Sequence, residues 1–319
     1  MNFLISGSAG FIGFHLSEFL LKKKHSVLGI DDLNNYYDVR LKKSRLNLLK
    51  KYKNFSFFKK KIEDIKIVNF FRKKKIDIII NLAAQAGVRH SLKNPYVYIN
   101  SNILGQVNML ELAKELKIKK YIYASSSSVY GGNKSLPFSV KDRVDNPISL
   151  YAASKKSTEL IAEYYSHLYK IKSIGLRFFT VYGPWGRPDM ATFIFTKNII
   201  NGKPINIFNY GKMKRDFTYV DDIVSGIYGS INLKMKKLHK VYNLGNSKSE
   251  SLLEFIKIIE KNLNKKAKKN FLPLQPGDVP ATFADISEST KDLKFLPKTK
   301  IKEGIPRFIE WFKKYYELL

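Results

Sequence analysis

A tyrosine and a lysine four positions apart are the side chains best suited to acid–base chemistry in this sequence. Tyr151 and Lys155 lie in the stretch YAASK. On a helix, residues four apart share a face, so both side chains can point into one pocket. A phenol with its ordinary pKa of about 10 is a poor base at neutral pH, but a neighbouring ammonium lowers that pKa by stabilising the phenolate. The pair predicts a phenolate base, although an inert amphipathic helix has the same spacing.

Four consecutive serines precede this pair, in the segment YASSSSVYG at residues 123–131. Serine runs are typical of loops and linkers. Here the run completes the strand-like stretch KYIYASS at 120–126, so a serine hydroxyl at the strand end can hydrogen-bond the oxygen that reacts. The interpretation of the tyrosine, the lysine and this strand end as an active site depends on a nucleotide-binding pattern near the N-terminus.

Three glycines follow the first strand-like segment. Gly7, Gly10 and Gly13 stand between NFLIS and a helical pattern, where dinucleotide-binding folds need a tight turn, room for a pyrophosphate and close helix–strand packing. The helix N-terminus adds free N–H groups and positive potential. Asp31 ends the second predicted strand, where an acid accepts ribose hydroxyls, and Asp32 follows it. Carboxylates repel a 2′-phosphate, so NAD is favoured over NADP; a glycine-rich turn without a ligand is the alternative.

The first two-thirds of the chain alternates short apolar runs with amphipathic stretches. This alternation predicts an α/β fold with a Rossmann-like, doubly wound parallel sheet. Nearly continuous apolar runs at 78–83 and 121–124 indicate strands covered on both faces. The predicted strands are 2–6, 26–31, 55–59, 76–83, 120–126 and 173–179, and the clearest helices are 11–23 and 157–170.

The alternation of apolar runs and amphipathic stretches ends after about residue 180. Residues 182–190 predict a loop, 192–202 a helix ended by Gly202, and 261–300 an irregular, proline-containing segment. We expect a smaller, partly interleaved C-terminal domain that forms the second half of a cleft. The predicted NAD-binding domain covers 1–180 with a returning segment at about 214–246, and the predicted substrate-binding cap covers 181–213 and 247–319.

Composition limits the class of protein. The 319-residue chain has no cysteine and five histidines without metal-ligand spacing, so neither disulfides nor a metal site are expected. No apolar run approaches the roughly 18 residues that span a bilayer, and MNFLISG has no signal-peptide pattern, so a soluble, cytoplasmic protein is expected. The net charge of +30 can indicate nucleic-acid binding. Because the lysines are spread over the whole length, a non-catalytic nucleic-acid-binding Rossmann protein is only a remote alternative.

Together the motifs resemble the extended short-chain dehydrogenase/reductase family of NAD-dependent nucleotide-sugar enzymes, from residue 1 to about 311. The matching segments are GSAGFIG, IDDLNNYYDVRLKKSRL, NLAAQAGVRHSL, YASSSSVYG, YAASK, RFFTVYGPWGRPDMA, NYGKMKRDFTYVDD and QPGDVPATFAD. In that family the catalytic hydroxyl lies three residues before the valine of S-x-x-V-Y-G, which implies Ser126 here. The resemblance implies Tyr151 as the base and Lys155 as its partner, which also holds the nicotinamide ribose.

The resemblance also implies a set of cofactor contacts. Many relatives carry an aspartate before the aliphatic residue that meets the adenine; here Lys61 precedes Ile62, so main-chain contacts would replace that carboxylate. The implied NAD-binding residues are Gly7, Ala9, Gly10, Phe11, Ile12, Gly13, Asp31, Asn34, Ile62, Ala83, Ala84, Gln85 and Lys155.

Relatives share oxidation at C4 of the sugar and differ in the step that follows. Dehydratases carry an Asp-Glu pair directly after the catalytic hydroxyl residue, and uronate decarboxylases carry a glutamate at the second of these positions. Ser127 and Ser128 stand there in this chain, and a hydroxyl cannot replace a carboxylate as acid or base. Thr180 replaces the asparagine of galactose-type epimerases, which favours a uronate.

The NNYYDVRLK insert, the AGVR loop and GRPDM are most similar to those of UDP-glucuronate 4-epimerases. The resemblance therefore implies epimerisation of UDP-glucuronate to UDP-galacturonate through a 4-keto sugar. A UDP-glucuronate decarboxylase and a UDP-glucose- or N-acetylglucosamine-type 4-epimerase are the alternatives. Ser127, Ser128 and Thr180 are the candidates to hold the uronate carboxylate.

The remaining implied contacts bind the UDP end of the substrate. Arg215 matches the family arginine that binds a phosphate with two N–H groups, and Arg89 is a second candidate. Arg187 would reach the diphosphate or the sugar, and Asp278 the uridine ribose or an arginine beside it. Tyr182, Trp185 and Phe208 suit either cap core or base stacking.

The family resemblance extends to assembly and pathway. Helices near 98–117 and 153–170 would pair with a second copy as a four-helix bundle, as in the dimers of the family, so a homodimer is expected. Surface polysaccharide biosynthesis is the expected pathway.

Overall fold

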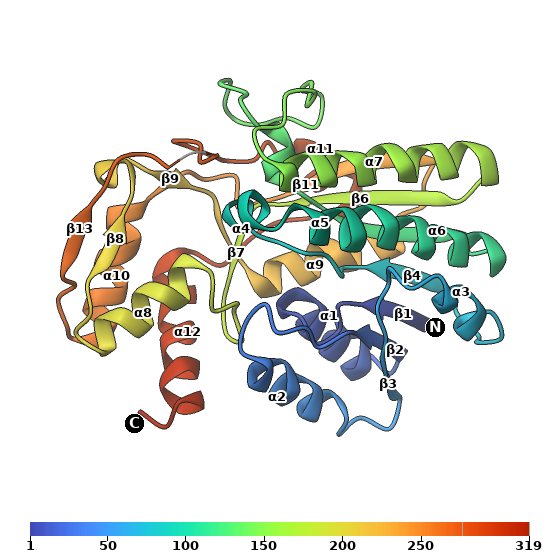
Figure 1. Cartoon of the computed structure of the whole chain (residues 1–319), viewed down its shortest axis with the longest axis horizontal. Helices are drawn as coiled ribbons and strands as arrows, with labels where there is room; N and C mark the ends of the chain where they lie inside the picture. Colours follow the sequence, from blue (N-terminus) through green and yellow to red (C-terminus); the bar gives the residue numbers. More distant parts are fainter. Residues whose placement is uncertain (276, 319) are drawn as a thin grey trace.

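The protein is described here by a computed structural model, which covers residues 1–275 and 277–318. Its centre is a parallel sheet of seven strands in the order β11-β6-β5-β4-β1-β2-β3 (Figure 1). The doubly wound α/β prediction is confirmed, and the six predicted strands are all present. The strands are β1 (Asn2–Ser6), β2 (Ser26–Asp31), β3 (Phe55–Lys59), β4 (Ile78–Asn81), β5 (Lys120–Ser126), β6 (Lys172–Phe178) and β11 (His239–Leu244).

Side chains alternate between the two faces of this sheet. Phe3 and Ile5 of β1 pack in one buried cluster with α1 (Phe11–Lys22) and α9 (Val220–Asn232). Leu4, between them, packs in another cluster with α6 (Gly105–Glu115) and α7 (Leu150–Tyr169). Helices thus cover both faces, which explains why the central strands read as continuous apolar runs.

The other helices connect strands or complete these layers. They are α2 (Val39–Leu49), α3 (Lys66–Phe71), α4 (Val88–Lys93), α5 (Pro95–Tyr98) and α11 (Ser287–Leu293), with a π-helical stretch, η1 (Ile99–Leu104), between α5 and α6. The start of α7 is set by Ser149, whose hydroxyl accepts a hydrogen bond from the Ala152 N–H. The helix therefore begins earlier than the predicted 157–170, and Tyr151 lies in its first turn.

A second apolar core lies beside the sheet, at the left of Figure 1. The stacked rings of Phe217 and Phe255, 4.0 Å apart, lie in it. Tyr182 is 2% exposed and Trp185 packs against Trp311 and Tyr315, so both belong to the core. The elements around it are α8 (Ala191–Ile200), α10 (Leu252–Leu263), α12 (Ile301–Tyr315) and the strand pairs β7 (Thr180–Tyr182) with β10 (Phe217–Tyr219), β8 (Ile205–Ile207) with β13 (Lys269–Phe271), and β9 (Lys214–Arg215) with β12 (Glu250–Ser251).

The segment 261–300 is more ordered than the sequence predicts. It contains β13 and α11, and Leu293 of α11 is buried against the sheet cluster. These elements are too short for their periodicity to stand out in the sequence. The predicted domain boundaries at residues 180, 214 and 246 stay a prediction.

Candidate active site

A cleft of about 960 Å³ opens at the carboxyl edge of the sheet, between the sheet and the second core. Parallel strands end at one edge, so residues that follow β2, β4, β5 and β6 meet there. The predicted site residues in its lining are Gly7, Gly10, Phe11, Ile12, Gly13, Asp31, Asn34, Ile62, Ala83, Ala84, Gln85, Arg89, Ser126, Ser127, Ser128, Tyr151, Lys155, Thr180, Arg187, Arg215 and Asp278.

The glycine turn between β1 and α1 forms one end of this cleft. Gly7 has a φ of +71°, and a Cβ there would lie 2.9 Å from the nitrogen of Ala83. A Cβ at Gly13 would lie 2.0 Å from the carbonyl oxygen of Gly7. No side chain caps α1, so its first N–H groups are available for a phosphate. The turn therefore fits the diphosphate of NAD.

Asp31 is buried at the end of β2. Its carboxylate accepts hydrogen bonds from the N–H groups of Ala9 (3.2 Å) and Leu33 (2.9 Å). Burial raises the pKa of Asp31, and Lys42, 4.0 Å away, opposes that rise. Ala9 is fully buried and is the one predicted cofactor residue outside the cleft lining. Its N–H donates to Asp31 and its carbonyl accepts from Arg45.

Lys42 is a lining residue that the sequence did not single out. Its ammonium is buried and donates to the Asn34 side chain at 2.9 Å, so it fixes the loop after β2. Many lysines in this chain have similar neighbours in the sequence, so only the fold shows that Lys42 is buried in the cleft.

Gln85 is placed by the π-helical stretch η1. The side-chain oxygen of Asn102 accepts from the Gln85 N–H at 2.8 Å, and its amide donates back to the Gln85 carbonyl. The same amide donates to Ser154 of α7 at 2.9 Å. Asn102 therefore joins the loop after β4 to the helix that carries Tyr151, a link without a sequence signal.

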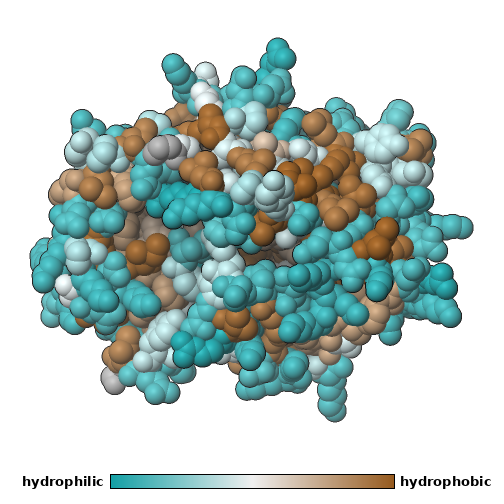
Figure 2. Space-filling view, in the orientation of Figure 1, coloured by the Kyte–Doolittle hydropathy of each residue, from teal (hydrophilic) through white to brown (hydrophobic). Residues whose placement is uncertain are grey.

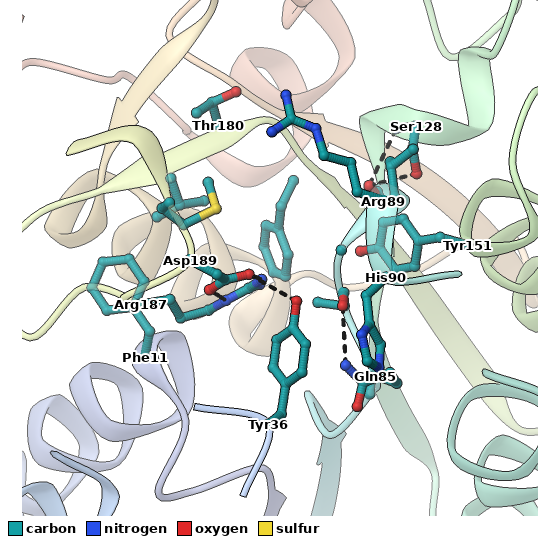
Figure 3. A pocket seen from close by; sticks show the side chains of 18 of the residues that line it. Phe11, Tyr36, Gln85, Arg89, His90, Ser128, Tyr151, Thr180, Arg187 and Asp189 are labelled. Atoms are coloured by element: carbon teal, nitrogen blue, oxygen red, sulfur yellow. Dashed lines mark hydrogen bonds and ion pairs between the residues drawn. The ribbon is translucent and has the colours of Figure 1, made fainter. Parts of the chain in front are cut away.

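Tyr151, Lys155 and Ser126 line the cleft where β5 ends against α7, and Figure 3 shows Tyr151 with Ser128 on this side. The Ser126 hydroxyl oxygen accepts from the main-chain N–H (3.2 Å) and the hydroxyl (2.9 Å) of Ser128. The Lys155 ammonium donates to the carbonyl of Ala124 at 3.0 Å. The serine run is therefore a strand end and not a linker.

The ionisation of the pair differs from the sequence prediction. Burial raises the pKa of Tyr151, while a hydrogen bond to Ser126 and the charge of Arg187 act to lower it. Lys155 was predicted to lower that pKa, but its ammonium is bound at Ala124 and its own pKa is lowered to about 8 by burial. The charge of Arg187 favours the Tyr151 phenolate, and the charge of its partner Asp189 opposes it.

A buried ion pair lies behind the reacting side chains. Arg177 of β6 donates to Glu159 of α7 at 2.8 and 2.9 Å, and the Ser125 hydroxyl donates to the same carboxylate at 2.6 Å. Both charged side chains are 4% exposed. The pair fixes β5, β6 and α7 together at the level of Ser126 and Lys155.

Basic and aromatic residues lie at the end of the cleft away from the glycine turn. Arg89 donates to Asp278 at 3.1 Å, and its guanidinium lies 4.6 Å from the ring centre of Phe208. Of the two partners predicted for Asp278, the structure shows the arginine. Arg215 is held by the carbonyls of Lys214 (2.9 Å) and Pro280 (3.2 Å).

Arg187 has a partner that the sequence did not predict. It lies on the loop between β7 and α8, where it forms an ion pair with Asp189, and Asp189 also accepts from the Tyr36 hydroxyl at 3.1 Å. Thr180, Ser127 and Ser128 also line the cleft, and Figure 3 shows Ser128 near Tyr151 with Thr180 across from them. In residues 1–275 and 277–318, no three His, Cys, Asp or Glu side chains form a metal site.

The glycine turn, the Asp31 position and the Tyr151–Lys155 pair define a nicotinamide-dependent nucleotide-sugar enzyme. The chain belongs to the NAD dependent epimerase/dehydratase family, whose model matches residues 3–245. The family predicted from the motifs is thereby confirmed.

Particular relatives narrow the comparison. The chain is 47% identical to UDP-glucuronate 4-epimerase of Thermodesulfobacterium geofontis, over 99% of this chain and 98% of that protein. It is 49% identical to Protein CapI of Staphylococcus aureus, over 99% and 100%. A crystal structure of UDP-glucuronic acid 4-epimerase from Bacillus cereus with UDP-glucuronic acid and NAD matches with a TM-score of 0.93 and 35% identity, over 99% and 100%.

Proposed function

We propose that this protein is an NAD-dependent isomerase that interconverts UDP-glucuronate and UDP-galacturonate by inverting C4. The observation that carries the proposal is the site at the end of β5: Tyr151 and Ser126 face one cleft, and the next two positions, Ser127 and Ser128, hold hydroxyls and no carboxylate. Relatives named UDP-glucuronate 4-epimerase, similar over nearly their full length, support it.

Tyr151 is the proton acceptor in the proposed mechanism. The glycine cradle would hold NAD, which would supply reversible hydride transfer at C4, with the sugar turning between removal and return of the hydride. Tyr151 removes the C4 hydroxyl proton and gives it back, while Ser126 donates a hydrogen bond to the reacting oxygen. Lys155, tied to Ala124, holds the nicotinamide ribose.

The 4-keto uronate is a β-keto acid that can lose CO₂, so the carboxylate has to be held away from the geometry of that bond cleavage. Ser127, Ser128 and Thr180 line the same cleft as Tyr151, and we assign them to this carboxylate. Hydroxyl donors bind the anion without supplying a base.

The UDP group is assigned to the other end of the cleft. Arg215 and Arg89 offer guanidinium groups for the diphosphate, which favours bidentate N–H donors. Phe208 lies below Arg89 and lines the cleft, so its ring is available to the uracil. Asp278, already paired with Arg89, keeps that arginine in place.

We further propose a homodimer formed through α7 and the helices beside it. Leu160, Tyr164 and Leu168 lie on successive turns of α7 and are 54%, 58% and 50% exposed, and Leu104 of η1 is 44% exposed. Figure 2 shows apolar residues over the part of the molecule where Figure 1 places α5 and α7. A contiguous apolar stripe of this kind is typical of an interface. A second copy of α7 would cover it in a four-helix bundle.

The proposed compartment is the cytoplasm and the proposed pathway is polysaccharide biosynthesis, which uses nucleotide sugars. Within the part of the chain that the structure describes, no helix could cross a membrane.

The test is to incubate the purified protein with UDP-glucuronate, without added NAD, and to identify the products by NMR. UDP-galacturonate is the expected product, and Tyr151→Phe should not form it. UDP-pentose with CO₂ would replace the proposal by a decarboxylase. Faster turnover of UDP-glucose or UDP-N-acetylglucosamine would replace it by an epimerase for neutral sugars. Salt-sensitive binding of nucleic acid, unchanged by Tyr151→Phe and without any turnover, would indicate a non-catalytic protein.

A further inference from the structure

Tyr36, Asp189 and Arg187 form a chain of contacts across the cleft. The Tyr36 hydroxyl donates to Oδ2 of Asp189 at 3.1 Å, and Arg187 donates its Nε to Oδ1 of the same carboxylate at 3.0 Å and its Nη2 to Oδ2. Tyr36 follows β2 and the other two residues lie between β7 and α8, so the contact joins segments 153 positions apart. Figure 3 shows the Tyr36 hydroxyl pointing at this ion pair.

The Tyr36 ring is itself held in one place. It packs edge-on against His90 with ring centres 4.9 Å apart. Its hydroxyl passes so close to the next loop that a Cβ on Gly87, where φ is +102°, would lie 2.6 Å from it. Tyr36 therefore contacts two other segments that line the cleft, the one at residues 87–90 and the loop that carries Asp189, and both set its orientation.

The orientation of Arg187 follows from these contacts. A guanidinium has five N–H groups in a rigid plane, and the two-point contact with Asp189 fixes that plane. Its positive charge acts to lower the pKa of Tyr151, and the charge of Asp189 acts to raise it. Asp189, Tyr151 and Tyr36 are the titratable groups that act on Arg187.

We propose that Tyr36 is a positioning residue, which acts through Asp189 to hold the guanidinium of Arg187 beside Tyr151 and so fixes the sugar end of the substrate. The proposal rests on the proposed UDP-hexuronate 4-epimerase function. Burial and the neighbouring Asp189 raise the pKa of Tyr36 to about 12, so its hydroxyl remains a donor at every working pH.

The first experiment compares Tyr36→Phe with the unaltered NAD-loaded protein. The variant keeps the ring and loses only the donor to Asp189. We expect kcat/KM for UDP-glucuronate to fall about tenfold, as for the loss of a hydrogen bond to a charged group. We expect the Kd for UDP, which has no sugar, to stay within about twofold, since Tyr36 does not act on the nucleotide end. The acid limb of the kcat/KM profile should move to higher pH, because a looser Arg187 lowers the Tyr151 pKa less.

Tyr96→Phe is the matched control, because Tyr96 is 77% exposed on α5. Its kinetics should equal those of the unaltered protein. Equal weakening of UDP and UDP-glucuronate by Tyr36→Phe, or a loss of activity that follows a drop in melting temperature, would overturn the positioning role and leave Tyr36 as a packing residue.

The second experiment is a double-mutant cycle with Asp189→Asn. If Tyr36 acts through Asp189, adding Tyr36→Phe to Asp189→Asn should cost less than twofold further activity. Two independent, multiplicative losses would overturn the proposal. Failure of the proposed function would instead be seen in the unaltered protein, as no turnover of UDP-glucuronate. The cycle would then use the UDP-sugar that the unaltered protein does convert.

Discussion

The ammonium of Lys155 donates to the carbonyl oxygen of Ala124 over 3.0 Å, so a side chain of helix α7 is bonded directly to the last residues of strand β5. Ala124 stands two residues before Ser126, and Lys155 lies one helical turn from Tyr151. Because both reacting elements are joined through this contact, the charge on Lys155 bears on the geometry as well as on the chemistry of the site.

Activity is expected to rise with pH and then to level off. Tyr151 must lose its proton to act as a base, so kcat/KM should rise as the pH rises on the acid side. Burial lowers the pKa of Lys155 to about 8, so its positive charge is lost as the pH rises through that value. Because burial also raises the pKa of Tyr151 above its ordinary value of about 10, the gain of phenolate and the loss of the ammonium offset each other above pH 8, and the rise in kcat/KM should level off there. Initial rates between pH 6 and 10 would measure the rise and the plateau; a rise that continues unchanged from pH 8 to pH 10 would contradict this ionisation of Lys155.

Replacing Tyr151 by phenylalanine should lower kcat by a factor of about 10² to 10⁴, the range for loss of a general base. The melting temperature should change by only a few degrees, because the ring is retained. Tyr210→Phe, at a residue that is 59% exposed and outside the cleft lining, is the control. Substantial activity in Tyr151→Phe would assign the base to another residue.

The hydroxyl of Thr180 is predicted to protect the 4-keto sugar from losing CO₂. Thr180→Val keeps the shape of the side chain and removes the hydrogen bond, so UDP-pentose should form a larger share of the products, by up to about tenfold. Thr180→Ser should restore the original ratio. An unchanged ratio in the valine variant would remove Thr180 from the carboxylate site.

Breaking the buried pair of Glu159 and Arg177 should destabilise the fold. Glu159→Gln leaves the Arg177 charge buried with a neutral partner, and the free energy of unfolding should fall by about 3–5 kcal/mol, measured by urea denaturation. Lys156→Ala is the control, because Lys156 lies 4.0 Å from Glu159 with a partly exposed side chain. Similar losses in both variants would mean that the buried pair has no special role.

The α7 stripe is predicted to be the dimer interface. Tyr164→Glu combined with Leu168→Glu should convert a species of about twice 36.9 kDa into a monomer, measured by light scattering after size exclusion. Leu296→Glu, at a residue 58% exposed outside α7, should leave the mass unchanged. A monomer in the unaltered protein would contradict the proposed homodimer.

Much of the fold and of the chemistry was predictable because the signals are local. Apolar runs located the six predicted strands, and the carboxyl edge of a parallel sheet gathered Asp31, Ser126 and the glycine turn without further information. The four-residue spacing of Tyr151 and Lys155 placed both on one helical face. Such patterns depend on backbone geometry that each segment carries by itself.

Other features depended on which distant segments meet. The chain itself specified a Rossmann-type sheet, a glycine cradle and a tyrosine–lysine helix, since these follow from periodicity and spacing. Only the tertiary structure decided that Tyr36 reaches Asp189 across 153 positions, that Arg89 pairs with Asp278, and that Lys155 turns to Ala124 while burial sets its pKa. Contacts and desolvation of this kind arise when loops from separate elements pack together, and no local sequence pattern encodes them.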